Sequence, residues 1–172
     1  MIVQNTFPFQ RIKLDMESEF RDEAFEELVD LLVKDFRASG AVGSLGSIKI
    51  PGEVRATVDR SAMLEALERR ESKMSTGIKK GLAIPHATIP GLPRFTGVLG
   101  ISKKGIDYGS LDGFPVYIVF LLLSPPEDSE AHLQALKRIA MLMDDDESIS
   151  SLQKSVSPAQ AYSILKTFDE IK

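Results

Sequence analysis

The feature that most constrains the fold of this chain is a continuous apolar run from Val116 to Leu123. Ser124-Pro125-Pro126 follows the run and ends it, so it has the length of a strand and is too short to span a bilayer. Because apolar residues occupy successive positions instead of alternate ones, both faces of this strand must be covered. We therefore predict a layered α/β domain, with strands in the middle and helices outside.

Apolar residues recur at helical spacing in four other stretches. We expect a first helix from Ser18 that ends at Gly40 and a second from Asp59 or Ser61 to Glu71. A third helix should begin at the acidic group 127–130, and a fourth at Ser157. In the second helix, Arg70 shares the stripe of Met63 and Leu67, near the helix end. In the third, His132 lies in the first turn, on the face that points inward.

The remaining segments are predicted as short strands, turns and loops. Residues 1–16 form an N-terminal arm or a short edge strand, and residues 97–101 form a second strand. We expect a loop or hairpin at the Gly-rich stretch 39–52, with local pairing of 47–50. Residues 105–108 and 111–113 are predicted as a turn, a short extended piece and another turn, and residues 144–147 as a solvated acidic loop. None of these segments has the character of a domain linker, so residues 1–172 are predicted to form a single domain.

Composition excludes several classes of protein. The net charge of −4 and the pI near 5.3 argue against nucleic-acid binding, which usually needs a basic surface. The absence of cysteine excludes disulfides, thiolate metal sites and cysteine nucleophiles. Residues 1–10 lack a basic region followed by a long apolar run, so no secretory signal is expected. We predict a cytoplasmic protein without direct membrane insertion.

The stretch from Gly77 to His86 is the best candidate for chemistry. Residues 82–84 are bounded by turn residues, as in a buried strand, and Pro85 should stop that strand because proline lacks a backbone N–H. His86 is then presented at the end of a strand on stiff backbone, a common place for a reactive group in an α/β protein. A structural histidine would be the plainer interpretation, just as Arg70 could be a solvated arginine at a helix end.

Other kinds of site find little support in the sequence. A metal site needs three or four ligands, and the chain has two isolated histidines and no cysteine. There is no G-x-S-x-G nucleophile elbow, and the stretch 77–81 lacks the G-K-[ST] ending of a phosphate-binding loop. The remaining kind of site is one in which a histidine acts as the nucleophile. His86 could accept a phosphoryl group, with His132 as a hydrogen-bond donor and Arg70 as a fixed positive charge, although spacing leaves open whether they meet.

Four motifs in register strengthen this hypothesis. They are the stretch 77–86, the pair Arg70-Glu71, the segment G-I-D-Y-G-S-L-D-G-F-P-V at 105–116, and H-L-Q-A-L at 132–136. Together they cover roughly residues 53–168. In this order they resemble the fructose/mannitol-type IIA domains of the bacterial sugar phosphotransferase system, a family that includes nitrogen-related IIA regulators.

The resemblance implies a role for each site residue. His86 would carry the phosphoryl group, received from an HPr-like protein and passed to a IIB domain or protein. His132 would bond the phosphoryl group, and Arg70 would be the cation beside it. The family fold implies a single domain with a mixed central sheet and helices on both faces, without metal or organic cofactor.

Two other functions stay open alongside the sugar carrier. The chain could be a nitrogen-related regulatory module, whose phosphorylation state controls binding to a transporter or kinase. It could also be a degenerate homologue with a structural role only. Ala87-Thr88 and the proline-rich loop after them depart from the family pattern, at a place that should border the partner surface.

Overall fold

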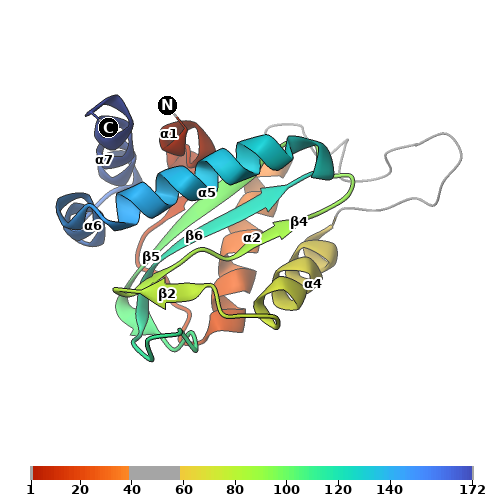
Figure 1. Cartoon of the computed structure of the whole chain (residues 1–172), viewed down its shortest axis with the longest axis horizontal. Coiled ribbons are helices and arrows are strands. Elements are labelled where there is room, and N and C mark those ends of the chain that lie inside the picture. The colour runs from red at the N-terminus through yellow and green to blue at the C-terminus, as the bar shows by residue number, and fades with distance from the viewer. Residues whose placement is uncertain (1, 39–58, 172) are drawn as a thin grey trace, which may run out of the picture.

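Strand β6, Val116–Ser124, is the centre of a mixed sheet in the computed structural model, which describes residues 2–38 and 59–171 (Figure 1). The sheet order is β1-β5-β6-β3-β2, and β4 also pairs with β6. β6 is antiparallel to β5 and parallel to both β3 and β4. The other strands are β1 Ile12–Lys13, β2 Gly77–Lys79, β3 Leu82–Ala83, β4 His86–Thr88 and β5 Thr96–Ile106.

Helices cover both faces of this sheet, as predicted. The helices are α1 Val3–Thr6, α2 Arg21–Ala38, α4 Arg60–Glu71, α5 Ser129–Met143, α6 Asp146–Gln153 and α7 Pro158–Ile171, with 3₁₀ helices η1 Phe9–Arg11 and η2 Pro126–Asp128. The core cluster on one face contains residues of α2 and α4, and the cluster on the other face contains residues of α1, α5, α6 and α7. In Figure 1, α5 crosses the near face of the sheet while α2 lies behind it.

The side chains of β6 explain why the strand is apolar throughout. Val119, Leu121 and Leu123 belong to the core shared with α2 and α4, whereas Phe120 and Leu122 belong to the core shared with α5. All of these side chains are fully buried. The prediction that both faces of this strand are covered is confirmed.

The loop between β5 and β6 is shorter than predicted. The turn and short extended piece predicted from Gly105 are part of a longer strand, because Gly105 and Ile106 belong to β5 and Ile106 pairs with Val116. The register shifts between Ile101 and Ile106, and Gly105 has a φ of 85°, so the pairing resumes after an irregularity. Asp112 is a turn former, accepting hydrogen bonds from the Ser110 hydroxyl and from the Phe114 N–H, each at 3.0 Å.

The acidic stretch 144–147 is a loop only in its first half, since Asp144 and Asp145 separate α5 from α6. Asp146 begins α6, and the side chain of Asp145 accepts a hydrogen bond from the Ser148 N–H at the helix N-terminus. Carboxylates favour the first turn of a helix because they satisfy free N–H groups and oppose the positive end of the dipole. On the surface, Asp144 pairs with Lys79 at the end of β2, and Asp146 of α6 pairs with Lys80 in the turn after it.

The N-terminal segment is partly as predicted. Ile12–Lys13 form the edge strand, parallel to β5, but the helical turn α1 was not predicted. The helix expected from Ser18 begins at Arg21, since the residues before it pair with the end of the β5 segment: Phe20 forms a parallel bridge with Asp107, whose N–H donates to the Glu19 carbonyl at 2.8 Å. The predictions for 39–52 and for pairing within 47–50 lie outside the described residues. No helix in the described ranges is long and apolar enough to cross a membrane.

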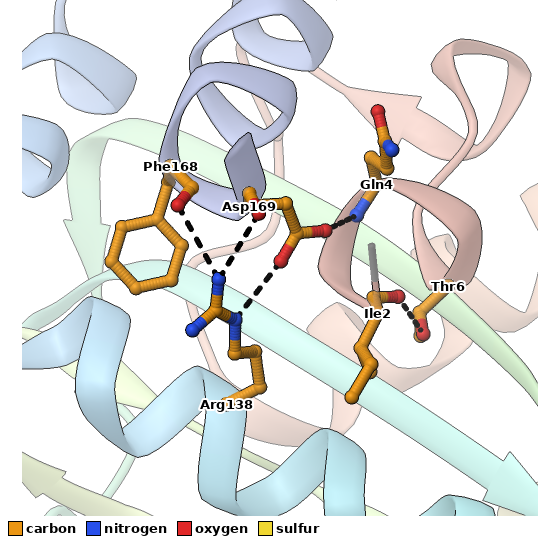
Figure 2. Close-up of polar contacts among 6 residues, drawn as sticks. All are labelled: Ile2, Gln4, Thr6, Arg138, Phe168 and Asp169. Atoms are coloured by element: carbon orange, nitrogen blue, oxygen red, sulfur yellow. Dashed lines mark hydrogen bonds and ion pairs between the residues drawn. The ribbon is translucent and has the colours of Figure 1, made fainter. Parts of the chain in front are cut away.

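A buried ion pair between Arg138 and Asp169 joins α5 to α7, and the same carboxylate also binds α1 (Figure 2). Asp169, whose side chain is 0% exposed, accepts a hydrogen bond from Arg138 Nε at 3.0 Å and another from the Gln4 N–H at 2.9 Å. The guanidinium of Arg138 also lies 4.8 Å from the centre of the Phe168 ring. One carboxylate therefore links α7, α5 and α1.

We predict that Asp169→Ala lowers the free energy of unfolding by about 3–5 kcal/mol, because it leaves Arg138 as a nearly buried, unpaired cation. The measurement is urea unfolding followed by circular dichroism. Glu170→Ala is the matched control, since Glu170 is exposed and pairs with Lys166 at 3.8 Å. The control should change stability by less than about 0.5 kcal/mol. Equal effects of the two variants would contradict the role assigned to Asp169.

Candidate functional site

His86 begins a strand, whereas the sequence predicted that it follows one. Pro85 interrupts the pairing after β3, but β4 starts at His86 and continues parallel to β6, with His86 opposite Leu122. Proline removes only its own N–H, and the Pro85 carbonyl still accepts a hydrogen bond from the Leu122 N–H at 2.9 Å. His86 is half-buried, at the start of a short strand that pairs with the central strand β6.

The hydrogen bonds of His86 fix its tautomer. Its Nδ1 lies 2.7 Å from the carbonyl oxygen of Ile84, and a carbonyl oxygen can only accept, so Nδ1 carries the proton. Nε2 then has a free lone pair, which accepts a hydrogen bond from Arg70 Nε at 3.1 Å. Both contacts agree on one tautomer, in which Nε2 is the nucleophilic nitrogen.

Arg70 comes from the last turn of α4, on the stripe that the sequence predicted. Met63 and Leu67 bury that stripe, and Arg70 extends from its edge to His86. A second nitrogen of the guanidinium, Nη1, donates to the carbonyl oxygen of Met74 at 3.1 Å. Two nitrogens of the guanidinium group, Nε and Nη1, therefore hold the Arg70 side chain in contact with the His86 imidazole.

Glu71 supports the segment that holds Arg70. Its carboxylate is buried and accepts hydrogen bonds from the Thr76 N–H at 2.9 Å, the Thr76 hydroxyl at 2.5 Å and the Ser75 hydroxyl at 3.1 Å. The phenol of the buried Tyr108 lies 2.9 Å from the same Thr76 hydroxyl. Since that hydroxyl donates to Glu71, Tyr108 is the donor in this contact. These hydrogen bonds join the two ends of the segment 71–76, which contains the Met74 carbonyl that accepts from Arg70.

From the sequence, Glu71 was identified only as part of the Arg-Glu pair. A carboxylate in the last turn of a helix opposes the negative end of the helix dipole, so its presence there needs compensation. The hydrogen bonds from Ser75 and Thr76 supply it. An acidic residue at a helix end, followed closely by two hydroxyl residues, is the signal that could have revealed this role.

His132 approaches His86 from the other side. It lies near the start of α5, and its ring centre is 5.5 Å from that of His86, at an angle of 70°. Its Nδ1 is 2.7 Å from the hydroxyl of Ser124, the last residue of β6. The structure thus brings together the three residues that the sequence singled out, although their spacing alone left this open.

These residues line a hollow in the protein surface. Its remaining lining includes two exposed cations, Arg69 and Lys73, which the sequence analysis did not single out. The hollow is lined by three cations, two imidazoles and no carboxylate, on a chain whose net charge is −4. This local excess of positive charge favours a small anion.

Burial favours the neutral form of both imidazoles, because it lowers the pKa of each. It is the main cause that lowers the pKa of His86, and the charge of Arg70 adds to it, while the hydrogen bond to Ile84 and the charge of Glu71 act in the opposite direction. Burial also lowers the pKa of His132, as does the neighbouring His86. A neutral imidazole with a free lone pair, next to a guanidinium, is equipped for nucleophilic attack on an anionic group.

The site offers little to a metal ion. Within residues 2–38 and 59–171, no group of three or more histidine, cysteine or carboxylate side chains is placed to hold one. His86 already uses Nδ1 and Nε2 in contacts with Ile84 and Arg70, and a guanidinium beside the ring would repel a cation. The chemistry of the hollow is that of an anion site.

Comparison with known proteins agrees with this geometry. Residues 6–168 match the family described as "Phosphoenolpyruvate-dependent sugar phosphotransferase system, EIIA 2". One relative, the fructose-specific EIIABC component of Bacillus subtilis, is 33% identical over 159 residues. That match covers 92% of this chain but only 22% of the relative, so the chain spans less than a quarter of that protein.

Solved structures share the fold. The nitrogen regulatory protein IIA-Ntr from Neisseria meningitidis superposes with a TM-score of 0.78 at 26% identity, covering 96% of this chain and 99% of that one. The mannitol enzyme IIA of Escherichia coli, in its complex with phosphorylated enzyme IIB, has a TM-score of 0.68 at 17% identity, covering 92% and 95%. The chain therefore belongs to the EIIA 2 family of the phosphoenolpyruvate-dependent sugar phosphotransferase system.

Proposed function

We propose that this protein is a phosphohistidine carrier, in which Nε2 of His86 accepts a phosphoryl group and passes it on. The observation that carries the proposal is the hydrogen bond from Arg70 Nε to Nε2 of His86, whose ring centre lies 5.5 Å from that of a second imidazole, His132. The carrier family to which the chain belongs supports the same reaction class. Such a reaction needs positioning and charge stabilisation more than bond-making groups from the protein.

In the proposed step, the lone pair of Nε2 attacks the phosphorus of an incoming phosphohistidine. A new P–N bond forms at His86 while the P–N bond to the donor ring breaks. The donor ring, protonated on its other nitrogen, keeps that electron pair and leaves as a neutral imidazole, and His86 keeps its Nδ1 proton, bonded to the Ile84 carbonyl, as a phosphorylated imidazolium. Arg70 Nε–H, which donates to Nε2 in the unphosphorylated site, must then move to a phosphoryl oxygen. His132 donates to another oxygen, and the charges of Arg69 and Lys73 add to the stabilisation.

The proposed partners follow from the same reaction. The donor is an HPr-like phosphocarrier protein, and the acceptor is a IIB domain or protein. The mannitol relative of this fold is known in complex with its phosphorylated enzyme IIB, which supports the second partner. The role places the protein in the cytoplasm, and the open hollow gives a docking protein access to His86.

A second candidate function is regulation. The resemblance to the Neisseria nitrogen regulatory protein favours it, since that structure superposes over almost its whole length. Phosphorylation would change the charge of the hollow by about −1.5 to −2, enough to gate an interface with a transporter or kinase. In this function, the phosphoryl group stays on His86 as a signal.

The proposed carrier predicts that His86 gains one phosphoryl group. Incubation of the purified chain with phosphoenolpyruvate, enzyme I and HPr should add the mass of one acid-labile phosphoryl group in intact-protein mass spectrometry. His86→Ala should gain none, because it lacks the nucleophile. His132→Ala, the matched control, keeps His86 and should still be phosphorylated. An equal gain in wild type and His86→Ala, or no gain in wild type, would overturn the proposal.

Transfer to an acceptor separates the two candidate functions. For the carrier, a IIB protein should remove the phosphoryl group from His86 within seconds to minutes, as followed by loss of the mass increment. For the regulator, the increment should persist, and affinity capture from cell extract should differ between the phosphorylated and unphosphorylated chains. His86→Asp, which carries a fixed negative charge, should then capture the partner of the phosphorylated form. Rapid loss to IIB with identical captures would exclude regulation.

The neutral state of the imidazoles predicts how stability depends on pH. An unfolded histidine binds a proton near pH 6.5, whereas the lowered pKa of His86 delays protonation in the folded chain. The unfolded state therefore binds more protons as pH falls through 6.5, and stability should fall with it. The loss can reach about 1.4 kcal/mol per pH unit for one histidine.

Urea unfolding at pH 7.5 and at pH 5.5 measures this dependence. His86→Gln removes one of the two histidines, so it should lose less stability than wild type between these values. The difference between the two proteins isolates His86 from the carboxylates, which titrate in both. Equal losses, or a larger loss in the variant, would show that His86 is not held neutral by the fold.

A further inference from the structure

Ser124 connects His132 to the strand that carries His86. It is the last residue of β6, is 1% exposed, and pairs in the sheet with Thr88 of the strand that carries His86. Its carbonyl oxygen accepts a hydrogen bond from the Ile89 N–H at 2.8 Å. Its hydroxyl oxygen lies 2.7 Å from Nδ1 of His132. In the sequence, this serine marked only the end of the strand.

The direction of the Ser124–His132 hydrogen bond follows from the surroundings of the hydroxyl. If Nδ1–H donated to Ser124, the serine proton would need a second acceptor. In the part of the chain that the structure describes, the Ser124 hydroxyl has Nδ1 of His132 as its hydrogen-bond partner and no other. Leaving a buried O–H unpaired is unfavourable, so the hydroxyl donates and Nδ1 accepts. The proton of the neutral His132 ring is then on Nε2.

We propose that Ser124 is a positioning residue that holds His132 as the Nε2–H tautomer, so that this ring can donate a hydrogen bond to the phosphoryl group on His86. The second half of this inference rests on the proposed function. The first half concerns the unphosphorylated chain alone. Among the described residues, Nε2 of His132 makes no hydrogen bond, so it is free to donate in the hollow that it shares with His86.

The hydrogen-bond partners of the two Nδ1 atoms thus give the two rings opposite roles. A carbonyl oxygen behind His86 forces its proton onto Nδ1 and leaves Nε2 as a nucleophile. A hydroxyl donor behind His132 forces its proton onto Nε2 and leaves that nitrogen as a donor. If both rings had a carbonyl behind them, both Nε2 atoms would carry lone pairs, and neither could bond a phosphoryl oxygen as a neutral ring.

Nitrogen-15 NMR of the unphosphorylated chain, labelled in its two histidines, tests the tautomer directly. His86→Gln assigns the remaining ring to His132. In wild type, we expect His132 to carry its proton on Nε2, with the Nδ1 resonance shifted by an accepted hydrogen bond. Ser124→Ala should move that resonance to the position of a free acceptor and raise the share of the Nδ1–H form. Ser124→Thr, which keeps a hydroxyl, should restore the wild-type spectrum.

The buried Ser102 provides the matched control for loss of a hydroxyl. Ser102 lies on β5, where its hydroxyl oxygen accepts from the Gly105 N–H at 3.1 Å. Ser102→Ala should leave the His132 ring resonances unchanged. The inference is overturned if wild-type His132 is mainly the Nδ1–H tautomer, or if Ser124→Ala leaves the Nδ1 resonance where it was.

Phosphoryl transfer tests the second half of the inference. Ser124→Ala should slow transfer from His86 to a IIB acceptor by about three- to tenfold, the effect of one weakened hydrogen bond. In a His132→Ala background, Ser124→Ala should cause no further slowing, because the serine acts through that ring. Full additivity of the two substitutions, or an unchanged rate in Ser124→Ala, would refute it. If wild type is never phosphorylated, the proposed function fails, while the NMR result still decides the tautomer.

Discussion

The parallel pairing of β4 with β6 is the constraint on which the site depends. It sets His86 opposite Leu122 and Thr88 opposite Ser124, and β6 then continues through η2 into α5. A side chain beside the end of β6 must therefore lie near the start of α5, where His132 is found. Because β6 is buried on both faces, a shift of this register would move apolar side chains out of two cores at once. The packing of the sheet thus protects the geometry of the two rings.

Most of the fold could be predicted from the sequence because its signals are local. The apolar run of β6, the periodic stripes of α2, α4 and α5, and the Ser157 cap each depend on neighbours within a few residues. The site residues His86, His132 and Arg70 were identified by composition and motif, since few other groups could do the chemistry. Their contact depends on strand pairing between distant segments, which no local pattern states.

The errors have the same origin. Pro85 does end β3, as predicted, but pairing with β6 begins again at His86 in β4, and within β5 pairing with β6 resumes at Ile106 after Gly105. The acidic stretch 144–147 has the composition of a loop, yet Asp145 and Asp146 suit a helix start, and lysines of the β2–β3 turn neutralise part of its charge. Nothing in the sequence indicated a role for Ser124 at the site, because that role depends on which ring its hydroxyl contacts in the folded chain.

The interruption at Pro85 is itself part of how the site works. In an uninterrupted strand, a side chain points away from the sheet and cannot bond the carbonyl two residues before it. Here the N–H of Ile84 bonds to the Thr76 carbonyl, and Pro85 turns the backbone so that the His86 ring reaches the carbonyl of Ile84. That contact puts the proton on Nδ1 and leaves Nε2 to Arg70. Thr76 also binds Glu71, so the segment that positions the guanidinium is joined to the backbone that sets the tautomer.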